Sequence, residues 1–216
     1  MRKHSEQTAY MGVFVCCACF VFWANKSGYL LKREKTMNEF GVKKVIAAVR
    51  TEEEFCAALD SSATHIFLLC SNIMTIKRQL DRAHNLGKKL FIHIDMSDGI
   101  GRDNAGVAYL ASLGVDGIIS TRTGIIRAAR EYAVPTVQRI FSIDSQATQT
   151  SANAAGNFHP TYIEIMPGVI PKVISRFCKS TDIPIIAGGL VETAEEVSAA
   201  LAAGAVAVST GNKNLW

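Results

Sequence analysis

Two short segments near the end of the chain have the composition of a phosphate-binding site. Gly188 and Gly189 end one apolar run, and Ser209, Thr210 and Gly211 end the next. Glycine lets backbone N–H groups approach an anion closely, and the positive end of a helix dipole favours negative charge. In a parallel barrel, the loops after the seventh and eighth strands commonly bind phosphate. We therefore predict that these five residues bind a phosphate group, with two ordinary tight turns as the alternative.

Further polar residues follow apolar runs and offer partners for the rest of a small ligand. Asp95 and Glu164 can accept hydrogen bonds from hydroxyl groups, while Arg50 and Arg139 can balance these charges or reach the phosphate. The set suits a polyol monophosphate better than a nucleotide, because few aromatic residues are placed to stack on a base. A structural salt bridge is the alternative for Arg139 and Glu164. His93 lies on the same strand face as Asp95 and is either a barrel-interior residue or a ligand contact.

Two loops are placed to close over such a ligand. They are residues 97–104 and the pair Pro167 and Gly168. We expect Gly168 to contact the ligand at the end of its strand. Arg102 is the expected closing contact, either to the phosphate or to Glu164.

The elements that position these residues alternate regularly. Eight apolar runs have the length of strands: residues 42–49, 65–70, 89–94, 116–120, 136–140, 162–165, 184–187 and 205–208. Helical stretches follow the first seven runs: one that begins near 51, then residues 73–86, 104–113, 124–132, 145–156, 169–180 and 193–203. This alternation predicts an α/β fold of the TIM-type (β/α)8 barrel. A doubly wound open sheet is the weaker alternative, because no GxGxxG motif follows the first strand.

The last outer helix of this barrel is predicted to be missing or reduced to one turn, because the chain ends eight residues after Val208. Its loss would leave apolar surface over the eighth and first strands. Leu215 and Trp216 are themselves apolar. We therefore predict a homodimer that buries this seam.

The first 36 residues differ from the rest. Six of the 23 Lys and Arg residues and two of the 19 acidic residues lie there, so residues 37–216 carry 17 of each sign. The apolar run of residues 9–24 is short for a membrane span, which needs about 20 residues, and no clear cleavage site for a secretory signal follows it. We favour Met37 as the functional start, with residues 1–36 a leader and residues 37–216 a single barrel domain without a membrane partner.

The composition of the body excludes several function classes. Apolar residues make up 49% of the chain, which excludes a disordered protein. Residues 37–216 have no net charge and so do not bind nucleic acid through bulk charge. Any anion site in them must be formed by a local group of residues. Their three cysteines, Cys56, Cys70 and Cys178, show no CxxC spacing, and the histidines are scattered. We expect a cytoplasmic protein with reduced thiols, no metal site and no cofactor.

Residues 45–216 resemble the glycerol-3-phosphate-responsive antiterminator family, also called glycerol uptake operon antiterminator regulatory proteins. The resemblance rests on VIAAVR at 45–50, IFLL at 66–69, FIHIDM at 91–96 with Gly99, Arg102 and Asp103, DGIISTR at 116–122, QRIFSIDS at 138–145, IEIMPGVIPKVI at 163–174, PIIAGGL at 184–190 and AVAVST at 205–210 with Leu215 and Trp216. Gly211 stands where the family pattern has Ser. The resemblance implies a non-enzymatic regulator whose effector is glycerol 3-phosphate. It further implies binding to the leader of glycerol uptake and metabolism mRNAs, which promotes transcription antitermination.

The residues themselves support RNA contact only weakly. The basic cluster best placed to hold RNA phosphates lies on the second helix and at the start of the third strand: Lys77, Arg78, Arg82, Lys88 and Lys89. A solvated helix face is the alternative, since Asp81 is spaced to pair with Lys77. Two other functions stay open. One is a small barrel enzyme that acts on a sugar or triose phosphate, with Asp95 and Glu164 as acid and base. The other is a ligand sensor that has lost RNA binding.

Overall fold

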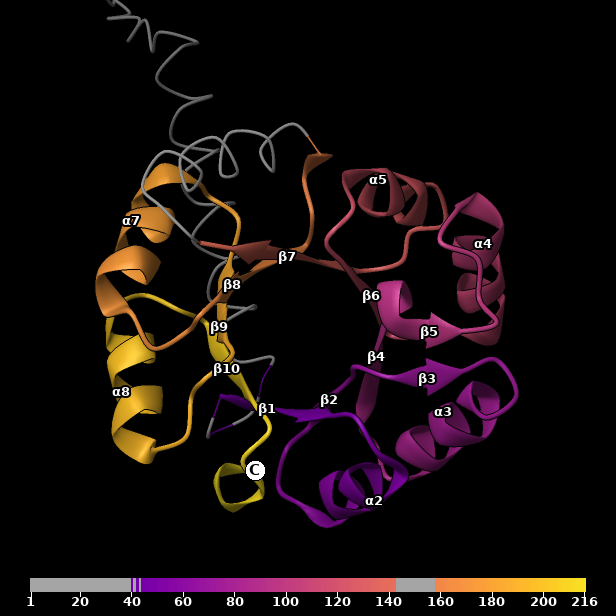
Figure 1. The fold of residues 1–216 in the computed structure, drawn as a ribbon, viewed down its shortest axis with the longest axis horizontal. Helices are drawn as coiled ribbons and strands as arrows, with labels where there is room; N and C mark the ends of the chain where they lie inside the picture. The colour runs from indigo at the N-terminus through magenta and orange to yellow at the C-terminus, as the bar shows by residue number, and fades with distance from the viewer. Residues whose placement is uncertain (1–39, 41, 43, 143–157) are drawn as a thin grey trace, which may run out of the picture. The chain divides into compact units, whose positions relative to one another are not determined.

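Eight parallel strands close into a barrel in the computed structural model, which describes residues 40, 42, 44–142 and 158–216 (Figure 1). The strands follow the ring order β1, β10, β9, β8, β7, β6, β4, β2. Their bounds are β1 Val45–Val49, β2 His65–Leu68, β4 Lys89–His93, β6 Gly117–Ser120, β7 Thr136–Phe141, β8 Tyr162–Met166, β9 Ile185–Gly188 and β10 Ala207–Thr210. The predicted TIM-type α/β fold is thus confirmed.

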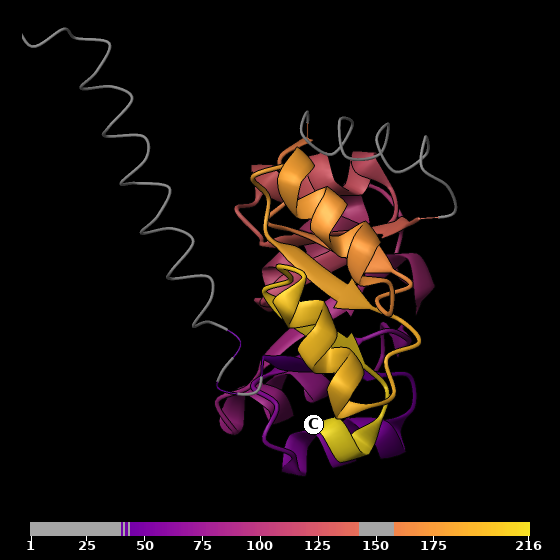
Figure 2. The ribbon, with the colours of Figure 1, turned by 90° about the vertical axis from the view of Figure 1, so that its left-hand side faces the viewer.

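Helices surround the strands, as Figure 1 shows, and Figure 2 shows α7 and α8 side by side on the outer face. The described helices are α2 Glu52–Asp60, α3 Ile76–Asn85, α4 Asn104–Leu113, α5 Thr123–Glu131, α7 Pro171–Ser180 and α8 Ala194–Ala202. Thr51 and Thr193 begin α2 and α8 with capping boxes, in which Glu54 and Glu196 reach back to the preceding backbone. The helix predicted over 145–156, the leader and Met37 lie outside the described residues.

Side chains alternate between two cores along every strand. The larger core lies between strands and helices, because it includes the buried faces of the helices. The smaller core contains no helix residue and fills the barrel interior. Phe67 and Phe91 lie in it with ring centroids 5.4 Å apart. Phe40 closes its lower end against His65 and Tyr162, at 4.7 and 5.3 Å between ring centroids. The polar residues of the candidate site lie at the other end, where the strands finish.

A second, two-stranded sheet was not predicted from the sequence. β3 (Ser71–Asn72) pairs in parallel with β5 (Ser97–Asp98), and the 3-10 helix η1 (Ile94–Met96) precedes β5. The Ser71 and Ser97 hydroxyl oxygens are 2.6 Å apart and buried. Two-residue strands have no hydrophobic period that could reveal them. This sheet joins the loops after β2 and β4 above the barrel.

The C-terminal residues correct the predicted exposed seam. A single 3-10 turn, η2 (Lys213–Leu215), stands in place of the last outer helix, as expected. Trp216 is only 5% exposed, and its indole Nε1 donates to the carbonyl oxygen of Thr210 at 2.8 Å. Val45 and Val208, on the two strands of the seam, are also buried. The expectation of apolar surface at this seam was therefore wrong, because the chain covers it itself, and the homodimer stays a prediction without that support.

A search of the described residues finds no helix that is long and apolar enough to cross a membrane.

Candidate functional site

Most of the predicted ligand residues lie at the ends of five neighbouring strands, β1, β10, β9, β8 and β7. The register pairs Arg139 with Glu164 across β7 and β8, and Gly188 with Ser209 across β9 and β10. Arg50 directly follows β1, which pairs with β10, and so lies beside the end of that strand. The barrel thus brings together at one side of its mouth residues that are far apart in the sequence.

Glu164 is at the centre of this side and is fully buried. Its Oε2 accepts a hydrogen bond from Arg139 Nε at 2.6 Å, and its Oε1 accepts one from the Ser209 hydroxyl at 2.6 Å. The structure therefore contains the Arg139–Glu164 salt bridge that was the structural alternative for these residues. A carboxylate held in this way serves to anchor three strands, and it has no oxygen without a partner to offer a ligand.

The sequence suggested that Gly188 lets the backbone approach a phosphate, but the structure gives a different reason for a glycine at this position. A Cβ at this position would collide with Oε1 of Glu164 and lie 2.9 Å from the Ser209 hydroxyl oxygen. The absent side chain therefore makes room for the Glu164 carboxylate rather than for a phosphate. Gly168 is needed in the same region, because a Cβ there would lie 2.7 Å from the backbone nitrogen of Gly188. Its N–H donates to the Gly189 carbonyl at 3.0 Å.

The hydroxyl groups of the predicted phosphate site are also occupied within the protein. Thr210 Oγ1 donates to the carbonyl oxygen of Val191 at 2.6 Å, and Ser209 donates to Glu164. The Gly211 N–H donates none of the turn and loop hydrogen bonds found among the described residues. The Gly189 N–H directly follows the Gly188–Ser209 pair of the β9–β10 ladder, which directs it toward the Ser209 carbonyl. An anion bound here would therefore rely on the Gly211 N–H and on Arg50, which follows β1 beside it, rather than on the Ser209 and Thr210 hydroxyl groups.

Gly211 has open space beside it. The nearest atom to a Cβ built there is the Ala48 carbonyl oxygen, at 3.7 Å, which is an ordinary contact. The position therefore accepts a side chain without rearrangement.

Asp95 lies across the mouth, after β4, and is tied to the end of β6. Its Oδ1 accepts from the Ser120 hydroxyl at 2.8 Å, and its Oδ2 accepts from the Thr121 N–H at 2.7 Å and the Thr121 hydroxyl at 3.0 Å. Burial opposes its ionisation, but these hydrogen bonds outweigh burial and lower the pKa of Asp95 below its ordinary value of 3.8. A carboxyl with a lowered pKa is poorly suited to donate a proton at pH 7.

His93 ends β4 inside the barrel and is 3% exposed. Its Nδ1 is buried and finds no hydrogen-bond partner in the described part of the chain. Burial lowers the pKa of His93, and the Arg139 charge lowers it further, although Asp95 and Glu164 act in the opposite direction. The imidazole is therefore neutral at pH 7. The sequence left open whether this residue is structural, and its strand position was the one available signal.

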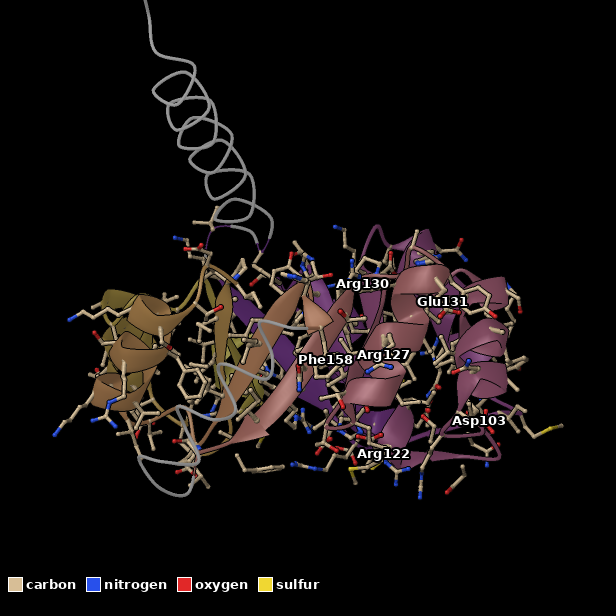
Figure 3. All side chains as sticks on the ribbon, turned by 90° about the horizontal axis from the view of Figure 1, so that it is seen from above. Asp103, Arg122, Arg127, Arg130, Glu131 and Phe158 are labelled. Atoms are coloured by element: carbon tan, nitrogen blue, oxygen red, sulfur yellow. The ribbon has the colours of Figure 1, made fainter. Side chains whose placement is uncertain are left out.

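Arg102 does not reach Glu164 in this structure. It lines an open pocket of about 480 Å³ between the start of α4 and the start of α5, together with Asp103, Arg122 and Ile125. Figure 3 shows Asp103 and Arg122 at neighbouring ends of these two helices. Arg122 Nε lies 3.8 Å from Asp95 Oδ1. Of the two predicted closing contacts of Arg102, the one to Glu164 is not found among the described residues, and the one to the phosphate stays a prediction.

The predicted RNA-binding cluster on α3 is largely engaged within the protein. Lys77 pairs with Asp81, and Arg82 pairs with Glu52. Lys88 Nζ donates to the carbonyl oxygens of Ser61 and Ala63, at 2.7 Å each. Arg78 is exposed, whereas Lys89, at the first position of β4, is half-buried.

A second group of basic residues lies on α5. Figure 3 shows Arg127 and Arg130 on the helix beside Phe158. The Arg127 guanidinium lies 5.2 Å from the centroid of the Phe158 ring, and Arg130 Nη1 donates to the Phe158 carbonyl at 3.3 Å. Arg127 and Arg130 are exposed at their helix positions, so α5 presents positive charge to solvent. The sequence alone could not show that the basic residues of α5 are more exposed than those of α3, because both helices carry basic residues at similar spacing.

The fold and the site together define an α/β barrel whose polar groups gather at the C-terminal ends of the strands. The sequence model described as glycerol-3-phosphate responsive antiterminator matches residues 45–216. The chain belongs to this family.

Relatives with known sequences or structures agree with this membership. The uncharacterized protein YgcP of Escherichia coli K12 is 36% identical over 173 residues, which cover 80% of this chain and 91% of YgcP. The crystal structure of a glycerol uptake operon antiterminator regulatory protein from Listeria monocytogenes has a TM-score of 0.78 at 34% identity, over 82% of this chain and 97% of that one. A glycerol uptake operon antiterminator-related protein from Thermotoga maritima has a TM-score of 0.72 at 29% identity, over 80% and 96%.

Barrel enzymes are similar in fold alone. A deoxyribose phosphate aldolase from Aeropyrum pernix has a TM-score of 0.62 at 12% identity, over 85% of this chain and 94% of that one. Many functions share this fold, so a likeness at this level carries no activity.

Proposed function

We propose that the chain binds glycerol 3-phosphate at the barrel mouth and, in response, promotes transcription antitermination at the mRNA leaders of glycerol uptake and metabolism genes. The observation that carries the ligand assignment is the Gly211 N–H, which donates no turn or loop hydrogen bond among the described residues and follows β10 at the mouth, beside the end of β1 and Arg50. Such groups bind phosphate oxygens through charge-assisted hydrogen bonds. Membership of a glycerol-3-phosphate responsive family supplies the choice of ligand.

The protein acts in this proposal as a regulator and not as an enzyme. Glu164 is held in a buried salt bridge, and the hydrogen bonds to Asp95 keep that residue ionised. The two carboxyl groups of the alternative enzyme function are thus both used to hold strands together. No cofactor takes part in the proposed function, because the regulator performs ligand binding and RNA binding only.

A substitution at Gly211 tests the phosphate assignment. Gly211→Asp places a carboxylate beside the proposed phosphate without a packing conflict, because the space at this position is open. We expect calorimetry to show glycerol 3-phosphate binding to the wild type, no binding of glycerol, and at least a hundredfold weaker binding to Gly211→Asp. Gly211→Ser is the matched control and should bind as the wild type does. Equal affinities of the wild type and Gly211→Asp would contradict the assignment.

The RNA step is tested separately with a transcribed leader of a glycerol uptake gene. RNA affinity is measured at fixed salt with and without saturating glycerol 3-phosphate, since phosphate contacts make RNA affinity depend on salt. We expect the ligand to tighten RNA binding by about five- to 150-fold, and RNA to tighten ligand binding by the same factor. Ligand binding without any RNA binding would leave the chain as a sensor alone. The predicted role of Arg102 is tested in the same cycle, where Arg102→Ala should weaken this coupling more than it weakens RNA binding without ligand.

A further inference from the structure

His93 has a hydrogen-bonding group that the protein itself does not use. The residue faces the barrel interior, since it is two positions after Phe91, which packs on Phe67 there. The side chain is buried, and Nδ1 is without a partner within the described residues. Buried polar atoms in native proteins nearly always have a partner, so a group that lacks one at the mouth of a barrel indicates a bound molecule.

The neighbouring carboxylates do not supply that partner in the described structure. Both oxygens of Glu164 accept hydrogen bonds from Arg139 and Ser209. Both oxygens of Asp95 accept hydrogen bonds from residues at the end of β6. The carboxylates of the mouth are thus turned toward the strands that they hold. His93 is left to interact with whatever occupies the mouth.

The position of His93 in the ring determines which part of a ligand it can meet. In the strand order β1, β10, β9, β8, β7, β6, β4, β2, strand β4 stands four places from β9, which is directly across the barrel. A phosphate held at Gly211 lies at the end of β10, which is next to β9. The other end of the ligand then points across the mouth toward β4 and His93.

The charge state of His93 suits a hydroxyl group better than a phosphate. Three charged groups act on the ring, namely Arg139 from β7, Glu164 from β8 and Asp95 after β4, and burial together with Arg139 keeps its pKa low. A neutral imidazole has one donor and one acceptor nitrogen, and a hydroxyl group likewise donates and accepts. A phosphate oxygen would accept only, and would favour a charged ring.

We propose that His93 hydrogen-bonds a hydroxyl group of the polyol part of the ligand, and is therefore the residue that distinguishes hydroxylated phosphate esters from alkyl phosphates. This proposal rests on the proposed function, because it requires a phosphate ester in the mouth.

The test compares two ligands on two proteins by calorimetry. Glycerol 3-phosphate has two hydroxyl groups, and n-propyl phosphate has none. We expect the wild type to bind glycerol 3-phosphate at least tenfold more tightly. His93→Phe keeps a ring of similar size without nitrogen atoms, and should lose about tenfold in affinity for glycerol 3-phosphate, as expected for one hydrogen bond. Its affinity for n-propyl phosphate should stay the same. Gln138→Leu, a buried residue on the outer face of β7, is the matched control and should alter neither affinity.

The outcomes separate this proposal from the function on which it rests. If the wild type binds neither ligand, the proposed function fails. If it binds glycerol 3-phosphate and His93→Phe discriminates between the ligands as the wild type does, the proposal for His93 is overturned. Nitrogen NMR of the wild-type imidazole supplies a reading that does not depend on a variant that folds. The His93 nitrogen signals should shift on addition of glycerol 3-phosphate and much less with n-propyl phosphate, and equal shifts would also overturn the proposal.

Discussion

The buried salt bridge between Arg139 and Glu164 should dominate the response of the barrel to single substitutions at its mouth. Arg139→Met keeps much of the side-chain volume but leaves the Glu164 carboxylate, at 0% exposure, with only the Ser209 hydroxyl as a partner. Loss of one partner of a buried pair typically costs ~3–5 kcal/mol, because an uncompensated charge remains in the interior. We therefore expect the free energy of unfolding to fall by about 4 kcal/mol.

Urea unfolding of three variants measures this effect. Lys77→Ala breaks the exposed pair with Asp81 and is the control, for which a loss of no more than about 1 kcal/mol is expected. The double variant Arg139→Met, Glu164→Leu removes both charges and should recover much of the lost stability. If Arg139→Met destabilises the protein no more than Lys77→Ala does, the reasoning about an uncompensated buried charge is wrong.

Four other substitutions test the packing and electrostatics of the barrel. Gly188→Ala should lower the free energy of unfolding by ~1–3 kcal/mol, because its Cβ overlaps the Glu164 carboxylate, whereas Gly211→Ala should leave it unchanged; similar values for both in urea unfolding would refute the close packing at 188. Asp95→Asn should lower the melting temperature at pH 7, since the ionised form is the one that Thr121 and Ser120 stabilise. The difference in melting temperature between the wild type and Asp95→Asn should disappear as the pH falls below 3.8, through the lowered pKa of Asp95 in the folded state. A difference that stays constant down to pH 2.5 would contradict this electrostatic role. Trp216→Ala should cost ~3–5 kcal/mol in thermal unfolding, as for other buried aromatic rings, and a loss below about 1 kcal/mol would show that the ring is not packed.

The alternation of strands and helices could be predicted because both cores leave a strong periodic signal. The predicted ends of several strands were wrong for local reasons that hydrophobic periodicity does not reveal. The first strand begins at Val45 instead of residue 42, because Lys44 has a positive φ of 52° that interrupts the extended backbone. The third strand ends one residue early, because Ile94 begins the 3-10 helix η1. The last strand runs over 207–210 and not 205–208.

The candidate site could be predicted as a set of strand ends, but the partners of its side chains could not. Strand order places Arg139 beside Glu164, and the sequence anticipated that pair as an alternative. The bonds from Ser209 to Glu164 and from Thr210 to the Val191 carbonyl depend on distances between chains of the barrel that no local pattern encodes. For the same reason, the free nitrogen of His93 becomes evident only when the partners of its neighbours are known.

The close fit of Gly168, Gly188, Glu164 and Ser209 links three strands into a unit that resists stepwise alteration. A methyl group at 188 requires that the carboxylate at 164 move or shrink, and any change at 164 also removes the partner of the serine hydroxyl. Libraries that aim to give this barrel a new ligand would therefore waste most of their members if they varied these four positions independently. Diversity is better placed at Gly211, where the nearest atom to a new Cβ is 3.7 Å away, so that a side chain can be added there while its neighbours keep their positions.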